Sequence, residues 1–247
     1  RNEISKKMII VIRDIEAATS NANLLSASGI PSMPLAVLAY EPIALDRSIF
    51  DIKYQSLIFT SKHAILHQAS FYSLPAWCVG STTAKVAHNA GYKNIITSSG
   101  NAQTLVRNLS HKTDRRKGPL LWVSGTDIAF DIEAYLTNKK FHINRAISYH
   151  MRPSNHLPNW FTELVKSNKI TGVLILSKRN FQCFRELMIK ANIWEYHKKW
   201  QLFTFDQIPF EPEEVSFFSG IIKSRDANFE HLFKVIKDWY SEIRELE

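Results

Sequence analysis

Short apolar runs alternate with helical stretches along almost the whole chain, and this alternation constrains the fold more than any other feature of the sequence. The first run, Met8–Ile12, precedes a helical stretch over residues 15–28, which Gly29 ends as a helix-terminating glycine. The alternation resumes at Leu57 and continues to a strand over residues 142–149. Uninterrupted apolar strands are typical of parallel sheets that are buried on both faces. The sequence therefore predicts an α/β protein of parallel sheets flanked by helices.

A break at Pro153 and Pro158 separates this series from a second one that extends to the end of the chain. A chain of 247 residues is long enough for two compact lobes of about 100–130 residues each. Two pairs of segments look alike, either as degenerate copies or as short runs that match by chance. They are 57–62 with 173–178, and 95–100 with 221–226.

Small hydroxylic residues follow several of the expected strands, where the next helix would begin. They occur at Thr60-Ser61, Ser81-Thr82-Thr83, Ser98-Ser99, Ser124-Gly125-Thr126 and Ser177. The carboxyl ends of parallel strands meet at one edge of a sheet, where open α/β sheets bind their ligands. Each helix start also presents unpaired N–H groups and a positive dipole end. Five such turns favour a shared anion site, although plain helix capping is the ordinary explanation for any single one. Ser61, for example, would cap a helix over residues 61–70, and a further helix is expected over residues 127–138.

Standard motifs for nucleotide binding, metal binding and acyl transfer are absent from the sequence. The segment that begins at Gly80 lacks the Gly-Lys-Ser/Thr ending of a P-loop, and no Gly-x-Gly-x-x-Gly follows a strand. No Gly-x-Ser-x-Gly elbow is present either. His63 and His67 have i,i+4 spacing but lack the intervening Glu of a zinc-binding helix, while His142 and His150 lack a third ligand. We therefore expect no metal site.

The chain is basic, with a formal net charge of +8, and this charge favours anionic partners. The densest positive run, residues 115–117, is interpreted as a solvated loop. A nucleic-acid-binding module would explain the charge, but no recognised motif or aromatic-basic platform supports it. Cys78 and Cys183 stand in apolar contexts and are expected to be buried, reduced thiols, which indicates a reducing compartment. No apolar stretch reaches the ~18 residues of a membrane span, and no signal peptide opens the chain. A cytoplasmic protein without a membrane or nucleic-acid partner is expected.

Tyr149 ends the last strand of the first series, just before the break at Arg152-Pro153. A phenol at this place could donate a proton or a hydrogen bond into a cleft between two lobes. A tyrosine packed at a strand end is the ordinary explanation, and the residues by themselves leave both open.

Five motifs, in their order and spacing, resemble those of the uroporphyrinogen-III synthase family over nearly the whole chain. Residues 57–64 resemble its strand followed by Thr-Ser-x-x-Ala, and residues 76–92 resemble Val-Gly-x-x-Thr-Ala with a later Gly-Tyr. Residues 121–127 resemble a strand that ends in x-Gly, and residues 146–150 resemble the Val-Tyr that ends the inserted lobe. Residues 10–14 resemble an opening Thr-Arg-Pro, with Ile12 and Asp14 in place of Thr and Pro.

The resemblance implies two α/β lobes, each a parallel sheet flanked by helices, joined by a two-stranded connector with the active site in the cleft between them. One lobe would be discontinuous, residues 1–38 plus 151–247, and the other, residues 39–150, would be inserted. The implied reaction is that of a lyase in heme biosynthesis. It cyclises hydroxymethylbilane to uroporphyrinogen III, inverts ring D through a spiro intermediate and releases water. The family uses no metal or organic cofactor, and a member is expected to be a monomer.

The resemblance also implies roles for particular residues. The substrate is a linear tetrapyrrole with eight carboxylates, which suits a basic protein with many helix N-termini. Tyr149 matches the family tyrosine and would donate the proton to the leaving hydroxyl. Arg13 matches a family arginine without a defined role. The expected binding positions are Arg13, Thr60, Ser61, Gly80, Thr83, Ser124, Gly125 and Ser177.

The sequence departs from the family pattern in its C-terminal third. After the strand expected at 200–205, Pro209 and Pro212 stand where a helix is usual, and Leu176 stands where Thr is common. An alternative therefore stays open, in which the chain is a non-catalytic two-lobe protein that binds an acidic metabolite or a tetrapyrrole.

Overall fold

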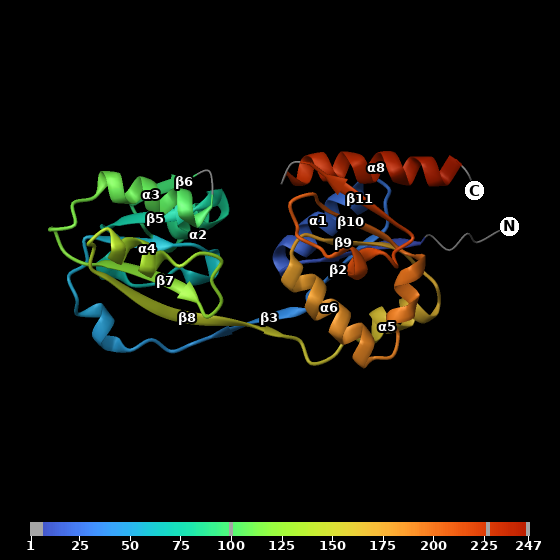
Figure 1. Ribbon diagram of the computed structural model, residues 1–247, viewed down its shortest axis with the longest axis horizontal. Coiled ribbons are helices and arrows are strands. Elements are labelled where there is room, and N and C mark those ends of the chain that lie inside the picture. The colour runs from blue at the N-terminus through green and yellow to red at the C-terminus, as the bar shows by residue number, and fades with distance from the viewer. Residues whose placement is uncertain (1–6, 99–100, 226–227, 246–247) are drawn as a thin grey trace. The chain divides into compact units, whose positions relative to one another are not determined.

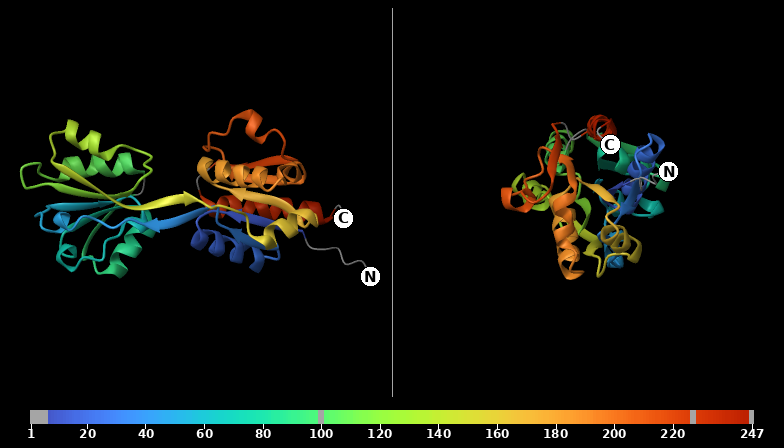
Figure 2. Two further views of the ribbon diagram at one scale, coloured as in Figure 1. Left: turned by 90° about the horizontal axis from the view of Figure 1, so that it is seen from below. Right: turned by 90° about the vertical axis from the view of Figure 1, so that its right-hand side faces the viewer.

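The computed structural model describes residues 7–98, 101–225 and 228–245, and the chain divides into two compact units. The discontinuous unit comprises residues 1–39 and 152–247, and the continuous unit comprises residues 40–151. Two strands, β3 (Leu38–Pro42) and β8 (Ile143–Pro153), carry the chain between the units and run side by side (Figure 2). They are antiparallel, because Val37 O accepts from Ser154 N while Ile43 N donates to Ser148 O.

Sheet A, in the discontinuous unit, has five parallel strands in the order β11-β10-β9-β1-β2. In chain order this is the 2-1-3-4-5 arrangement of flavodoxin-like folds. One face packs against α1 and α8, and the other packs against α5 and α6 (Figure 1). The strands are β1 (Met8–Ile12), β2 (Ser32–Leu35), β9 (Ile170–Ile175), β10 (Gln201–Phe205) and β11 (Gly220–Ser224). The helices are α1 (Ile15–Ala27), α5 (Asn159–Lys166), α6 (Lys178–Lys190), η4 (Trp194–Lys199), α7 (Pro212–Val215) and α8 (Phe229–Glu245).

Sheet B, in the continuous unit, has the strand order β3-β8-β7-β4-β5-β6. It is mixed, because β3, one of the two connecting strands, runs antiparallel to β8, whereas β4 to β8 pair in parallel. One face buries residues of α3 and α4, and the other buries residues of α2, η2 and η3. The other strands are β4 (Ser56–Phe59), β5 (Pro75–Val79), β6 (Asn94–Ser98) and β7 (Leu120–Gly125). The helices are η1 (Arg47–Phe50), η2 (Lys62–Ala64), η3 (Ala69–Phe71), α2 (Gly80–Ala90), α3 (Ala102–Lys112) and α4 (Ile132–Asn138).

The two sheets share one strand arrangement in permuted chain order. Strands β9, β10 and β11 take the places in sheet A that β4, β5 and β6 take in sheet B, with β1 and β2 matching β7 and β8. The segment pairs that looked alike in sequence therefore occupy equivalent strands. In each sheet the strand order reverses at one point, between β1 and β9 in sheet A and between β4 and β7 in sheet B.

Two predicted helices differ in the structure. Residues 61–70 form the short 3-10 turns η2 and η3 in place of one helix. Between these turns the chain is extended at Ile65 (φ −67°, ψ 122°), and Ala64, Ile65 and Phe71 are all buried in the core. Helix α4 starts five residues later than expected, after Asp131, whose carboxylate accepts from Ala134 N at 2.9 Å. Residues 126–131 are therefore a loop.

Helix ends and thiols follow the predictions. Gly91 ends α2 with a φ of 110°, the left-handed conformation that favours glycine, and Gly29 follows α1 with a φ of 82°. Cys78 and Cys183 are buried and free, and burial raises the pKa of the Cys78 thiol to about 12. Within the described residues, no helix is long and apolar enough to span a bilayer.

Candidate active site

The predicted site residues fall into two groups, one in each unit. Arg13 and Ser177 belong to the discontinuous unit. The other seven belong to the continuous unit: Thr60, Ser61, Gly80, Thr83, Ser124, Gly125 and Tyr149. In both units the residues lie at or near the carboxyl ends of strands, where ligands bind in open α/β sheets.

A cavity of about 320 Å³ lies in the continuous unit at the carboxyl ends of β4, β5 and β7. It therefore spans the point at which the strand order of sheet B reverses. Four predicted residues line it, namely Thr60, Ser61, Gly125 and Tyr149. The remaining lining residues are Val79, Asn101, Ala102, Trp122, Asp127, Ile128, Ala129 and Phe130.

The ring of Tyr149 packs directly against the backbone of Gly125. A Cβ atom added to Gly125 would lie 2.7 Å from Cε2 and Cζ of the Tyr149 ring and 3.1 Å from its hydroxyl. No side chain fits in that space, so glycine at 125 is required for the ring to take this position. The ring is 8% exposed and belongs to the core cluster around Phe59 and Val123.

Two further rings accompany Tyr149. The imidazole of His63 and the phenol of Tyr40 each have their ring centroid 5.7 Å from that of Tyr149. Tyr40 and His63 stack on each other at 5.0 Å. His63 thus belongs to a three-ring cluster with Tyr40 and Tyr149 beside the cavity. Its own main-chain N–H is bound by the Ser61 hydroxyl at 3.2 Å.

A change of register between β7 and β8 places the Tyr149 side chain on the face of sheet B that carries Phe59 and Val123. Along β7 and β8 the partners run from Trp122 with Arg145 to Ser124 with Ile147, but Gly125 pairs with Tyr149 and skips one residue of β8. Side chains alternate between faces in a regular strand, so residues 146 and 149 would lie on opposite faces. Ala146 and Tyr149 instead share one core cluster, as a bulge between them allows.

The remaining predicted residues of the continuous unit do not line this cavity. Ser124 is buried, and its hydroxyl donates to Gly125 O at 3.0 Å and accepts from Arg145 Nε at 2.9 Å. Thr83 is buried on α2. Gly80 begins that helix with a φ of 75°, a conformation that favours glycine. Of the hydroxylic turns, Ser61 and Ser177 cap helices through their side chains in the described chain. Ser99 of one turn lies outside the described residues.

Sequence reasoning missed Trp122 and the loop over residues 127–130, which together line much of the cavity. In the sequence, Trp122 has the pattern of an ordinary strand residue, and residues 127–130 are predicted to begin a helix. Trp122 is 1% exposed, and its Nε1 is buried without a hydrogen-bond partner in the part of the chain that the structure describes.

Arg13 and Ser177 flank the corresponding reversal point in sheet A. They follow β1 and β9, whose neighbouring ends pair Ile12 with Ile175. Arg13 Nη1 donates to Asn21 Oδ1 at 2.5 Å, and burial lowers the pKa of its guanidinium. Ser177 Oγ accepts from Asn180 N at 3.1 Å and so caps α6. Both residues thus lie at a ligand-binding edge with their side chains already engaged.

The segment that departs from the family pattern is attached to the start of α6. Lys178 Nζ donates to Pro209 O at 3.1 Å and forms an ion pair with Glu214. Burial opposes ionisation of the Glu214 carboxyl, but its hydrogen bonds with Lys178 and the Glu211 N–H outweigh this and lower its pKa. The helix here is the four-residue α7, which begins at Pro212.

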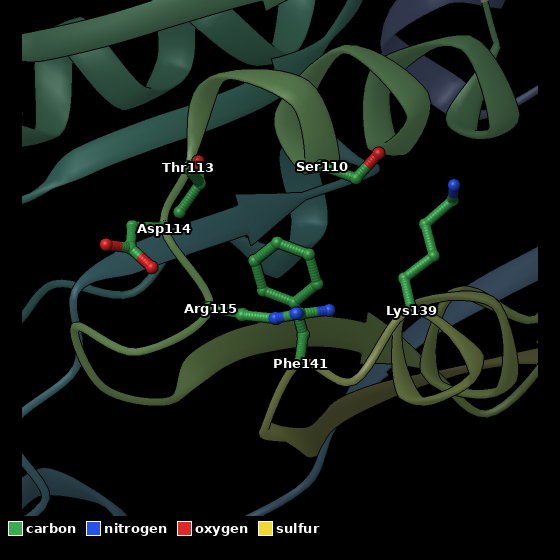
Figure 3. Close-up of a pocket in the computed structure, with 6 residues that line it drawn as sticks. All are labelled: Ser110, Thr113, Asp114, Arg115, Lys139 and Phe141. Carbon is green, nitrogen blue, oxygen red and sulfur yellow. The ribbon is translucent and has the colours of Figure 1, made fainter.

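A second cavity, of about 430 Å³, lies at the opposite edge of sheet B, after α3 and α4 (Figure 3). Its lining includes Arg115 and Lys139, whose side chains extend toward the hollow from different loops. The neighbouring Arg116 pairs with Asp114 at 3.1 Å. The positive run is exposed and lies on a loop, as predicted. In the described residues, no group of three His, Cys, Asp or Glu side chains could hold a metal ion.

These features define a class: a two-unit α/β protein whose ligand cavity lies at the carboxyl ends of the strands, beside a tyrosine packed on glycine. The chain belongs to the uroporphyrinogen-III synthase family, whose model "Uroporphyrinogen-III synthase HemD" matches residues 20–208. Family membership makes it an enzyme of heme biosynthesis with a tetrapyrrole substrate.

Solved structures of the family share the fold. The uroporphyrinogen-III synthetase of Helicobacter pylori superposes with a TM-score of 0.63 at 14% identity, over 94% of this chain and 99% of that one. A mutant uroporphyrinogen III synthase from Thermus thermophilus gives a TM-score of 0.54 at 9% identity, over 96% and 99% of the two chains. Comparison with curated protein sequences gives no match.

Proposed function

We propose that this chain is a lyase that cyclises hydroxymethylbilane to uroporphyrinogen III, with inversion of ring D and release of one water molecule. The observation that carries the proposal is the family match over residues 20–208 together with the cavity at the reversal point of sheet B. The cavity is lined by the phenol of Tyr149, the hydroxylic residues Thr60 and Ser61, and Trp122, all in the continuous unit.

Tyr149 is proposed as the proton donor. Its hydroxyl would protonate the substrate hydroxyl as the C–O bond breaks, so that water leaves and the protonated, electrophilic azafulvene remains beside the phenolate, which would regain its proton from a pyrrole as the reaction proceeds. A pyrrole carbon of ring D then attacks the azafulvene to form the spiro intermediate, and rearrangement followed by ring closure inverts that ring. The azafulvene is reactive by itself, so the protein's further contribution is to hold the chain in a productive conformation. The close packing of Tyr149 on Gly125 supports this role because it restricts where the phenol can lie.

Substrate carboxylates are proposed to bind at the strand ends of both units. In the continuous unit, Thr60 and Ser61 line the cavity. In the discontinuous unit, Arg13 and the start of α6 at Ser177 supply positive charge and free N–H groups. The roles of Gly80, Thr83, Ser124 and Gly125 are proposed to be structural, in keeping with their burial or backbone conformation. The lobe boundaries at residues 38/39 and 150/151, the monomeric state and the cytoplasmic location belong to the same proposal.

The test is to incubate the protein with freshly prepared hydroxymethylbilane and to separate the oxidised porphyrin isomers. Mostly isomer III is expected. Isomer I alone, the product of spontaneous closure, would overturn the proposal and point to a protein that only binds its ligand. The Tyr149→Phe variant should fold normally and lose most turnover, about 10²-fold or more, the usual size of a general-acid contribution. An unchanged rate in that variant would remove the role of Tyr149 and leave the family assignment intact.

A further inference from the structure

Arg145, on β8, makes four contacts with the end of the neighbouring strand β7. Its guanidinium carbon lies 4.8 Å from the centre of the Trp122 ring. Its Nε donates to Ser124 Oγ at 2.9 Å, and its Nη2 donates to Gly125 O at 2.9 Å and to Thr126 O at 3.2 Å. Trp122 and Ser124 are each 1% exposed, whereas Arg145 and Thr126 are half-buried, so the guanidinium covers a buried part of β7. A planar guanidinium is the side chain best suited to hold several oxygens in one fixed arrangement.

The contact with Gly125 O also concerns Tyr149. The peptide group between Gly125 and Thr126 is trans, so its N–H points away from its carbonyl. That N–H, of Thr126, donates to Tyr149 O at 3.1 Å. One peptide group is therefore held from one side by the Arg145 side chain and from the other by the main chain of Tyr149.

The same peptide group lies where the register changes. Gly125 pairs with Tyr149 only because β8 has one residue more than β7 at this place. This extra residue puts the Tyr149 side chain on the same face of sheet B as Phe59 and Val123. The Tyr149 ring then packs on Gly125 itself. Rotation of the Gly125–Thr126 peptide would break the bond to Tyr149 O and move the surface on which the ring rests.

We propose that Arg145 is a positioning residue for the reaction, which acts by locking the end of β7 and thereby the place of the Tyr149 phenol. The proposal deepens the proposed function and rests on it for turnover, but the position of Tyr149 is measurable without turnover. Arg145 is not among the residues that line the cavity. A residue of this kind changes the rate of the chemical step more than the binding of substrate.

The experiment compares the Arg145→Gln and Arg145→Lys variants with wild type and with Arg107→Gln. Arg107 is an exposed arginine on α3 of the same unit, so its loss controls for the charge. In Arg145→Gln, kcat should fall about 10–100-fold with a KM within about 3-fold of wild type, since a small misplacement of a reacting group costs this much. Arg145→Lys keeps the positive charge but not the several N–H donors of the planar guanidinium, and should have an intermediate kcat. Arg107→Gln should match wild type.

A second measurement follows Tyr149 directly in the protein without substrate. Ring-to-ring nuclear Overhauser contacts of Tyr149 with Tyr40 and His63, whose centroids are each 5.7 Å away, should weaken or vanish in Arg145→Gln and persist in Arg107→Gln. Persistence of these contacts in Arg145→Gln, or a kcat equal to wild type, would overturn the proposal. If Arg145→Gln does not fold, Arg145→Lys decides by the same two measurements. If wild type yields only isomer I, the proposed function fails, and the ring contacts still decide whether Arg145 places Tyr149.

Discussion

Gly125 is the residue in the candidate site whose identity the structure constrains most. Its missing side chain leaves the space that the Tyr149 ring occupies, since an added Cβ would lie 2.7 Å from two ring carbons. Replacement by alanine keeps the backbone allowed, because Gly125 does not adopt a positive φ, and so the change acts through the ring. The effect is therefore confined to this contact.

We expect Gly125→Ala to displace Tyr149, to lower kcat about 10-fold or more, and to cost about 1–3 kcal/mol of stability as an overpacked contact. Isomer-III formation and urea unfolding measure the two effects. A double-mutant cycle with Tyr149→Ala is the control, because Gly125→Ala should cost much less stability once the ring is gone. Equal costs in both backgrounds would show that the clash is not with Tyr149.

At the scale of elements, the 3-10 helix η4 contains a histidine that the fold keeps from water. His197 is 1% exposed, its ring stacks on Trp194 at 3.8 Å, and its Nδ1 is hydrogen-bonded to Trp194 O. Within the described chain its Nε2 has no partner. Burial lowers the pKa of this imidazole, and the bond to Trp194 O only partly opposes the shift.

This shift predicts how stability depends on pH. The unfolded chain binds a proton at His197 below about pH 6.5, whereas the folded protein does not until its lower pKa is reached. The contribution of His197 to stability should therefore be constant above about pH 6.5 and fall as the pH drops toward the folded pKa, so that the melting temperature is lower at pH 5.5 than at pH 7.5. The His197→Gln variant should have a flatter melting profile over this range. An equally steep profile in that variant would assign the effect to other groups.

At the scale of the whole molecule, each unit has its own cores on the two faces of its sheet. Leu174 on β9 and Leu121 on β7 are comparable residues, since each is fully buried in a central strand of its own sheet. Truncation to alanine removes the same atoms in either unit and leaves a cavity in one core only.

We expect Leu174→Ala and Leu121→Ala each to cost about 2–5 kcal/mol. Hydrogen exchange read by mass spectrometry should rise in β1, β9 and β10 for the first variant and in β4, β5 and β7 for the second, because local opening follows the unit that lost packing. Uniform loss of protection in both sheets for both variants would contradict two separately stabilised units.

Much of the fold follows from local patterns that the sequence shows directly. Apolar runs such as Met8–Ile12 became buried strands, and Gly29 and Gly91 ended helices, because strand burial and left-handed helix ends depend on residues adjacent in the chain. The hydroxylic strand ends at Thr60 and Ser61 led to the correct edge of the sheet, since the carboxyl ends of parallel strands share one edge.

The rest depended on contacts between distant segments. The helix expected at residues 61–70 gave way to turns that bury Ile65 and Phe71, because tertiary burial outweighed local helix preference. The register change between β7 and β8 and the hydrogen bonds from Arg145 to β7 both join residues about 20 positions apart in the chain. No local sequence pattern encodes such a pairing. The sequence by itself thus determined the α/β class, the family and the edge of sheet B at which the cavity lies. The tertiary structure decided which residues reach the cavity, because the face of the sheet to which Tyr149 points depends on the strand beside it.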